Sequence, residues 1–317
     1  MPTGCSPLPR IVYYASPQPR AKDPYGFWEQ KHRRMSQIDI PASWAWSAAE
    51  IAQRRWRKVL VIGAVDRGKS TYCGFLSRHL LAAGWRVAIV DADVGQKDIG
   101  PPATITLGSP DASLAKVQPT ALYFVGAVSP VGHLLPMVIG TRRLVDAAQG
   151  EFVLINTTGL VQGVGRMLKG YKIEAVQPDV IVAIEQGTEL QPITKAYRNY
   201  RTLRIQPSAS ATVKTPEQRR EARERAFGSY FQAATEVVLP CRSLIFQRRD
   251  VPTGFEQHLL CGVADRRNKG LGLAIITELN WSRGTLALLT PVLAESIRII
   301  QGGALHLTPD GCELGRR

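Results

Sequence analysis

Short apolar runs alternate with segments of helical periodicity through the first two thirds of the chain. The runs Val59–Ile62 and Arg86–Asp91 enclose a helical stretch from Ser70 to Ala83 that is closed by Gly84. Further along come the apolar runs LYFVG, FVLINT and VIVAIEQ, with helical stretches at Thr141–Ala148 and Arg166–Val176. Such alternation is typical of a parallel sheet covered by helices on both faces. We therefore predict an α/β fold with a mostly parallel sheet.

The pattern changes after Leu239. Four strand-like runs follow, separated by Gly, Asn, Arg and Pro and without an amphipathic helix among them: CRSLIFQR, QHLLCGVAD, LGLAIITELN and GTLALLTPV. Short strands divided by turn residues are typical of an all-β unit. The sequence thus predicts a small β domain over residues 239–317.

The beginning of the chain has no sustained periodicity. Residues 1–35 are rich in proline and basic residues, which predicts an N-terminal arm rather than part of the core. Pro41 then suits the first turn of a helix that ends near Trp56. We accordingly expect the α/β domain to span residues 36–238.

Charge adds one constraint on partners. Lys and Arg number 40 against 26 Asp and Glu, a net charge of +14. This excess favours a polyanionic partner such as nucleic acid or an acidic membrane face, although an effect on solubility alone gives the same total. No stretch approaches the roughly 18 apolar residues that a membrane span needs, and the N-terminus has no apolar leader. We expect a cytoplasmic protein without a membrane partner.

The five cysteines lie far apart, without a C-x-x-C pair or a histidine at metal-ligand spacing. An odd, scattered set is typical of thiols in a reducing compartment. It argues against a zinc site.

One motif carries clear chemistry. It fits G-x-x-x-x-G-K-[ST] and consists of Gly63, Ala64, Val65, Asp66, Arg67, Gly68, Lys69 and Ser70, followed by Thr71. It lies between a predicted strand and a predicted helix, where backbone N–H groups and the helix N-terminus can surround phosphate oxygens. In such a loop Lys69 reaches the β- and γ-phosphates, and Ser70 binds Mg²⁺. The motif predicts binding of ATP or another nucleoside triphosphate but not the reaction.

The next predicted strand runs into the segment DADVGQKDIGPP, residues 91–102. Strands of a parallel sheet end at one edge, so Asp91 and Asp93 should face the same crevice as the phosphate loop. A carboxylate there can hold Mg²⁺ through water or accept a proton from an attacking hydroxyl. Aspartates at strand ends also form turns, and the segment alone does not separate these roles.

Together these segments resemble the polynucleotide 5′-hydroxyl kinases, a family that includes RNA kinases of mRNA 3′-end cleavage, tRNA splicing and rRNA processing and shorter archaeal and bacterial relatives. The resemblance is carried by the phosphate loop and DADVGQKDIGPP, by LYFVGAVSPVGH and NTTGLVQGVGRMLKGYKIEAVQPDVIVAI, by TPEQRREARERAFGSYF and by the β-rich tail. It covers most of the chain from Val59 onward and looks most like the archaeal branch.

The resemblance implies roles for individual residues. Asp93 matches the family's general base, and Asp91 lies behind it near the magnesium waters. Gln96 begins a clasp around the substrate end, over about residues 93–102. Thr157 and Thr158 match residues near the γ-phosphate and the acceptor. Two arginines, Arg166 and Arg223, are further candidates for substrate contacts.

The arginine-rich segment predicts a helix from Glu217 to Phe227, with Thr215 as its N-cap. In the family such a helix is a lid over the nucleotide, here over about residues 214–231. Arginines on it would meet the negative charge of the transferring phosphoryl group. Arg219 matches the principal lid arginine, and Lys214 stands where relatives often carry another.

Two features depart from the longer relatives. Leu160 replaces a tryptophan that can stack on a nucleobase, and the chain lacks room for their N-terminal β domain. The sequence therefore leaves open both RNA against DNA and ATP against GTP.

Three functions remain in competition. The first is a kinase that transfers the γ-phosphate to the 5′-hydroxyl end of RNA or DNA. The second is a catalytically silent, nucleotide-bound scaffold in RNA processing, and the third is an ATPase that remodels nucleic acid. The presence of Lys69, Asp93 and the lid arginines favours the kinase, and no second nucleotide-sensing motif supports the ATPase.

Overall fold

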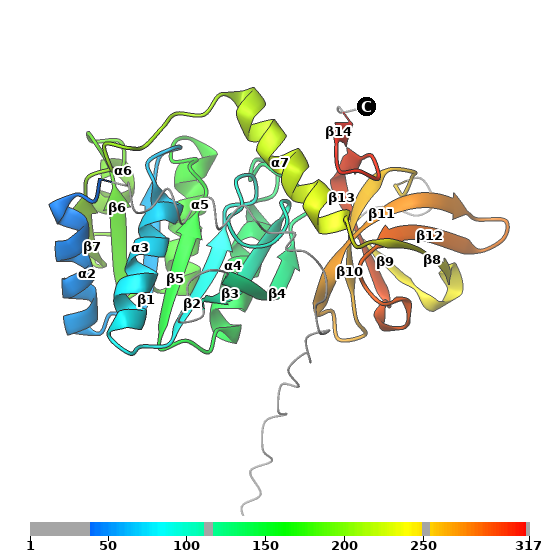
Figure 1. Cartoon of the computed structure of the whole chain (residues 1–317), viewed down its shortest axis with the longest axis horizontal. Coiled ribbons are helices and arrows are strands. Elements are labelled where there is room, and N and C mark those ends of the chain that lie inside the picture. Colours follow the sequence, from blue (N-terminus) through cyan, green and yellow to red (C-terminus); the bar gives the residue numbers. More distant parts are fainter. Residues whose placement is uncertain (1–38, 111–116, 249–253, 315–317) are drawn as a thin grey trace, which may run out of the picture.

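Five parallel strands form one end of the sheet, with β7 at its edge (Figure 1). The computed structural model describes residues 39–110, 117–248 and 254–314, so the predicted arm over residues 1–35 lies outside it. The strands lie in the order β2 (Val87–Ala92), β5 (Phe152–Thr157), β1 (Lys58–Gly63), β6 (Val180–Ile184) and β7 (Arg201–Ile205). Every residue of β2, β5 and β6 is buried, which explains their continuous apolar sequences. The predicted α/β architecture is confirmed.

An antiparallel hairpin extends this sheet beyond β2. Its strands are β3 (Thr104–Pro110) and β4 (Val117–Phe124), and β3 pairs antiparallel with β2. Apolar periodicity does not reveal β3, because its buried positions include Thr104 and Thr106 and it ends in Gly-Ser-Pro. The sheet is therefore mixed.

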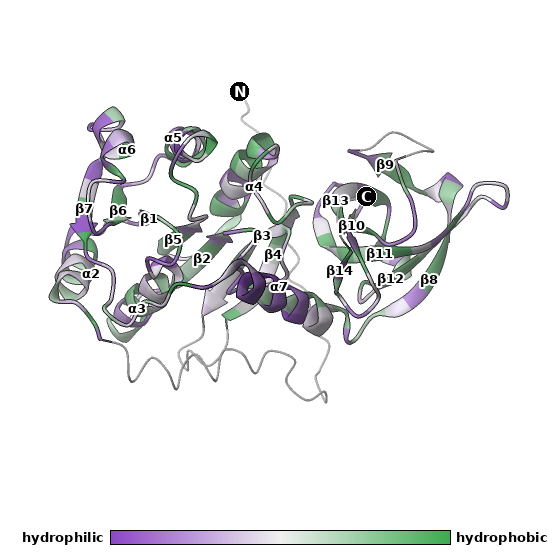
Figure 2. Cartoon of the chain, turned by 90° about the horizontal axis from the view of Figure 1, so that it is seen from above, coloured by the Kyte–Doolittle hydropathy of each residue, from purple (hydrophilic) through white to green (hydrophobic). Residues whose placement is uncertain are grey.

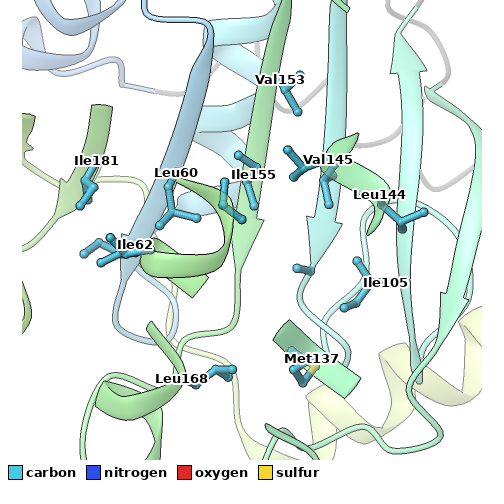
Figure 3. Close-up of a cluster of buried hydrophobic side chains, with 14 of the residues drawn as sticks. Leu60, Ile62, Ile105, Met137, Leu144, Val145, Val153, Ile155, Leu168 and Ile181 are labelled. Atoms are coloured by element: carbon cyan, nitrogen blue, oxygen red, sulfur yellow. The ribbon is translucent and has the colours of Figure 1, made fainter. Parts of the chain in front are cut away.

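Helices cover both faces of the parallel strands (Figure 2). One face carries α2 (Ala42–Arg54) and α3 (Lys69–Ala82), and the other carries α4 (Leu134–Ala147), α5 (Val164–Val176) and α6 (Gln191–Ala196). The cluster beneath the second group includes Leu60, Ile155 and Leu168 (Figure 3). Among the described helices, none is long and apolar enough to cross a membrane.

Helix α4 begins at Leu134 and not at the predicted Thr141. Pro136 falls in its first turn, where the missing N–H of a proline breaks no helical hydrogen bond. Gly140 lies in the middle of the helix against the sheet: a Cβ added there would stand 2.4 Å from Cδ1 of Tyr123 and 2.9 Å from Cδ1 of Ile105. The apparent breakers in the sequence are thus a tolerated proline and a close-packing glycine.

The C-terminal strands form a β-rich tail. They are β8 (Thr235–Pro240), β9 (Ile245–Gln247), β10 (Leu259–Ala264), β11 (Gly270–Asn280), β12 (Thr285–Thr290), β13 (Ile299–Leu307) and β14 (Glu313–Leu314), with 3₁₀ turns at Cys241–Ser243 and Ala294–Ser296. The tail joins the main sheet where Gly270 of β11 pairs with Leu122 of β4. The boundary expected at residue 239 falls inside β8, which pairs along its whole length with β12. We therefore place the start of the tail at Thr235.

The arginine-rich helix α7 (Pro216–Phe231) connects the two parts (Figure 1). Its N-terminus has a full capping box, in which Thr215 and Gln218 each accept from the other's backbone N–H. Its C-terminal end runs one turn beyond the prediction, because Phe227 and Phe231 are buried between the sheet and the tail. The helix is thus fixed at one end by apolar packing.

We expect Gly140→Ala to lower the free energy of unfolding by up to about 2 kcal/mol. Forcing a methyl group against Tyr123 and Ile105 costs about 1–3 kcal/mol, and better helix propensity returns about 1 kcal/mol. Denaturant unfolding measures the change. Gly187→Ala, in an exposed loop where only the end of Glu189 lies near the added Cβ, is the control and should change stability by less than about 0.5 kcal/mol. Equal losses in both variants would contradict the close packing.

Candidate active site

The carboxyl ends of β1, β5 and β2 bring three loops together. In the sheet register, Asn156 of β5 lies beside Val61 of β1 on one side and Asp91 of β2 on the other. The phosphate loop, the Thr157–Leu160 loop and the DADVGQKDIGPP segment therefore begin side by side. This is the edge at which open parallel sheets bind ligands.

The phosphate loop has the backbone that its motif requires. Asp66 and Gly68 adopt positive φ angles of 59° and 79°. A Cβ at Gly63 would stand 2.9 Å from the carbonyl oxygen of Ile184. Helix α3 begins at Lys69, so its free N–H groups face the loop. The result is a backbone site for phosphate oxygens.

Lys69 is held inside this loop. Its side chain is buried, and Nζ donates to the carbonyl oxygen of Ala64 at 2.8 Å. Burial lowers the pKa of the Lys69 ammonium, and the charges of Asp93 and Asp66 act in the opposite direction. Ser70, the next residue, is half-buried.

Asp91 organises the start of the clasp segment. One of its oxygens accepts from Asp93 N and Asn156 Nδ2, and the other accepts from Asp98 N and Ile99 N at 3.0–3.2 Å. Lys97 adds an ion pair, with 3.3 Å between Nζ and Oδ2 and both side chains 1% exposed. These donors fill the acceptor capacity of the carboxylate. Asp91 therefore holds the clasp, and its expected contact with the magnesium shell stays a prediction that would require some of these bonds to open.

Asp93 faces the phosphate loop with one oxygen tied down. Oδ1 accepts from Gly95 N and Gln96 N, both at 3.1 Å, which fixes the carboxylate at the mouth of the clasp. Burial raises the pKa of the Asp93 carboxyl above its usual value, while the charge of Lys69 and these two backbone bonds oppose the rise. A carboxylate made more basic by burial is suited to accept a proton.

The lid reaches both the clasp and the phosphate loop. Nη2 of Arg219 donates to Oδ2 of Asp66 at 2.5 Å, and the backbone N–H of Lys214 donates to the same oxygen at 3.0 Å. Gln96 Nε2 donates to the carbonyl oxygen of Arg219 at 3.3 Å. Nε of Arg219 is buried without a partner among the described residues. Residues from the phosphate loop, the clasp and the lid, which are distant in sequence, thus contact one another.

Of three further candidates for substrate contacts, two are bound to other parts of the protein and one is exposed. Nε and Nη2 of Arg223 donate to the two carboxylate oxygens of Glu313 in β14, at 2.6 and 3.1 Å. Thr157 donates its hydroxyl to the carbonyl of Val61 and so ties β5 to β1. Arg166 is exposed in the first turn of α5. The proposed contacts of these residues with substrate remain predictions, and Arg223 would first have to leave Glu313.

Two buried lysines on α5 escaped the sequence analysis. Lys169 and Lys172 are fully buried. Nζ of Lys169 donates to the carbonyl and hydroxyl oxygens of Thr158 and to the carbonyl of Leu160, at 2.8–3.1 Å. Their spacing relative to Leu168 and Val176 places both on the buried side of the helix, a signal that the sequence does contain.

The chain resembles known proteins over most of its length. A family model described as "mRNA cleavage and polyadenylation factor CLP1 P-loop" matches residues 63–233. A protein from Pyrococcus furiosus named polyribonucleotide 5′-hydroxyl-kinase is 32% identical, over 87% of this chain and 95% of its own length. One of the same name from Methanocaldococcus jannaschii is 31% identical, over 81% of this chain and 89% of its own.

Solved structures agree on the fold. A structure of a wild-type Clp1p–Pcf11p complex superposes with a TM-score of 0.59 at 14% identity, covering 89% of this chain and 78% of that one. The family model spans more than half of the chain, and the Pyrococcus relative is matched over nearly all of its length. The chain therefore belongs to the CLP1 P-loop family.

Proposed function

We propose that the protein is an ATP-dependent polynucleotide 5′-hydroxyl kinase that phosphorylates the 5′-hydroxyl end of RNA. The observation that carries the proposal is the meeting of three groups in one crevice: the ammonium of Lys69, the carboxylate of Asp93 and the guanidinium of Arg219, which is held against the phosphate loop by Asp66. The names of the archaeal relatives supply the acceptor, a polyribonucleotide 5′-hydroxyl.

In this reaction the 5′-hydroxyl oxygen forms a bond to the γ-phosphorus as the bond to the β–γ bridging oxygen breaks, and ADP leaves. Asp93 accepts the hydroxyl proton. Its second oxygen serves this purpose, because Oδ1 is occupied by the backbone N–H groups of Gly95 and Gln96. Desolvation of the carboxylate makes it a stronger base.

Charge on the transferring phosphoryl group is met by donors from two sides. Lys69 and the N–H groups of the loop lie below it, and Arg219 reaches over it from the lid. The unpartnered Nε of Arg219 and the Nη2 now bound to Asp66 are the donors available to phosphoryl oxygens. Placing such donors in advance lowers the barrier to transfer.

The residues of the phosphate loop offer one position that suits Mg²⁺. The Ser70 hydroxyl, in the first turn of α3, forms no hydrogen bond within the described part of the chain and would hold the ion. Bound Mg²⁺ would neutralise charge on the β- and γ-oxygens. The carboxylate of Asp91 already accepts from several protein donors. Its role would be to keep the clasp and Asp93 in place.

The scaffold alternative makes a different prediction for the same residues. A silent nucleotide-bound protein needs the phosphate loop but neither the base nor the lid arginine. The bonds that fix Asp93 and the contact from Gln96 to Arg219 favour transfer.

We expect wild-type protein to move ³²P from γ-labelled ATP to the 5′ end of a 5′-hydroxyl RNA oligonucleotide. Asp93→Asn and Lys69→Ala should each slow transfer by about 100-fold or more, because one removes the base and the other a phosphate-binding charge. A DNA oligonucleotide of the same sequence tests the choice of acceptor.

Asp146→Asn is the matched control for the carboxylate. This side chain is 55% exposed on α4 and pairs with Arg142, so the variant should keep full activity. If the wild type binds ATP but labels neither RNA nor DNA, the kinase proposal fails and the scaffold takes its place.

The second experiment concerns the lid. Arg219→Ala should lower kcat roughly 10²–10³-fold, the typical loss for one preorganised donor to transition-state charge. Arg225→Ala is the control on the same helix: Arg225 is 68% exposed, pairs with Glu221 and should change kcat less than about twofold when replaced.

Asp66→Asn separates catalysis from simple attachment of the lid. Asparagine tolerates the positive φ of this position and removes the carboxylate that holds Arg219. If Arg219 contacts the phosphoryl group, Arg219→Ala will lose much more activity than Asp66→Asn. Equal losses in single-turnover assays would mean that Arg219 only fastens the lid.

A further inference from the structure

Lys172 is a buried amine without a hydrogen-bond partner. Its relative exposure is 0%, and Nζ contacts no donor or acceptor among the described residues. Lys172 lies one turn after Leu168, which belongs to the apolar cluster over the sheet (Figure 3). A buried polar atom without a partner is rare and requires a physical reason.

The buried lysines Lys69, Lys97 and Lys169 each have oxygen partners. Lys69 binds Ala64, and Lys97 binds the backbone and side chain of Asp91 and the hydroxyl of Thr106. Lys169 has three oxygen partners. Lys172 differs from them in having no partner among the described residues.

The charges near Lys172 show where its amine lies. Asp93 and Asp91 at the end of β2 and Lys97 of the clasp interact electrostatically with it. Lys169, on the same helix, is a fourth neighbouring charge. The Lys172 amine therefore lies on the side of α5 that faces the clasp and the proposed base. Burial lowers its pKa to about 7, so both the charged and the neutral form are accessible near neutral pH.

We propose that Lys172 is a phosphate-binding residue of the transfer site, which donates to a phosphate oxygen when substrates are bound. The inference rests on the proposed kinase function. Two phosphates can supply the oxygen: the γ-phosphoryl group of the nucleotide, and the first internucleotide phosphate of the acceptor, which is the one nearest the 5′-hydroxyl. Either would give the amine the anionic partner that the protein does not provide.

The first measurement is thermal stability without substrates. Lys172→Met keeps the apolar stem and removes the unpartnered nitrogen, a change that is neutral or stabilising when the buried charge has no partner. We expect an unchanged or higher Tm. A markedly lower Tm for both Lys172→Met and Lys172→Gln would show that the amine has a structural partner, and it would overturn the proposal.

The second measurement tests the nucleotide as the source of the phosphate. Calorimetric titrations compare ADP with adenosine 5′-(β,γ-imido)triphosphate, each with Mg²⁺, on the wild type and Lys172→Met. A loss of about tenfold or more that is confined to the triphosphate analogue identifies the γ-phosphoryl group.

The third measurement tests the acceptor. The first linkage of a 5′-hydroxyl oligonucleotide is made either as a phosphodiester or as an uncharged methylphosphonate, and kcat/KM is measured for each. If Lys172 binds this phosphate, the wild type will prefer the phosphodiester about tenfold or more, and Lys172→Met will lose the preference. Lys195→Met, an exposed lysine on α6, is the control and should behave as wild type in every assay.

The outcomes separate the two proposals. If the wild type phosphorylates no acceptor, the kinase function itself fails. If the wild type is active and Lys172→Met matches it in triphosphate affinity and in linkage preference, only the role of Lys172 is refuted.

Discussion

The arrangement of the site depends on the buried ion pair between Asp91 and Lys97. Backbone N–H groups from Asp93, Asp98 and Ile99 converge on the same carboxylate, so the clasp folds around one charge at the end of β2. Lys97 also reaches Thr106 of β3, which ties the clasp to the hairpin. Removing one partner of such a pair would leave a buried charge uncompensated, at a cost of about 3–5 kcal/mol. These hydrogen bonds and the ion pair fix the position of Asp93.

Around that centre, three segments distant in sequence contact one another directly. The phosphate loop supplies Asp66 as the acceptor for the lid, the clasp supplies Gln96, and the lid supplies Arg219. A Cβ at Gly159 would stand 2.6 Å from Cα of Val65, so the loop after β5 also presses on the phosphate loop. Asp93, the phosphate loop and Arg219 therefore belong to one connected set of contacts rather than to separate surface features.

The parts of the structure that local pattern determines were predictable. Buried parallel strands, the G-x-x-x-x-G-K-S loop and the capped lid helix each have a sequence signature, and each is present. Strand β3 had no apolar sequence signature, because its buried positions include Thr104 and Thr106. The pairings of Arg219 with Asp66 and of Arg223 with Glu313 join residues 153 and 90 positions apart, and only the fold determines them. Helical periodicity could have placed Lys172 on the buried side of α5. Only the packing of the folded chain shows that its amine has no partner among the described residues.

Helix α7 is attached very differently at its two ends. Phe227 and Phe231 are buried at the junction with the tail, and Arg223 and Glu224 bind β14 through Glu313. Towards the phosphate loop, polar contacts to Asp66 hold the helix, and the preceding residues 209–215 are exposed. The C-terminal end of the helix is therefore anchored by buried apolar contacts, and its N-terminal end by polar contacts that water can replace. If the helix acts as the lid proposed above, its N-terminal end can leave the phosphate loop while the end packed against the β-rich tail stays in place.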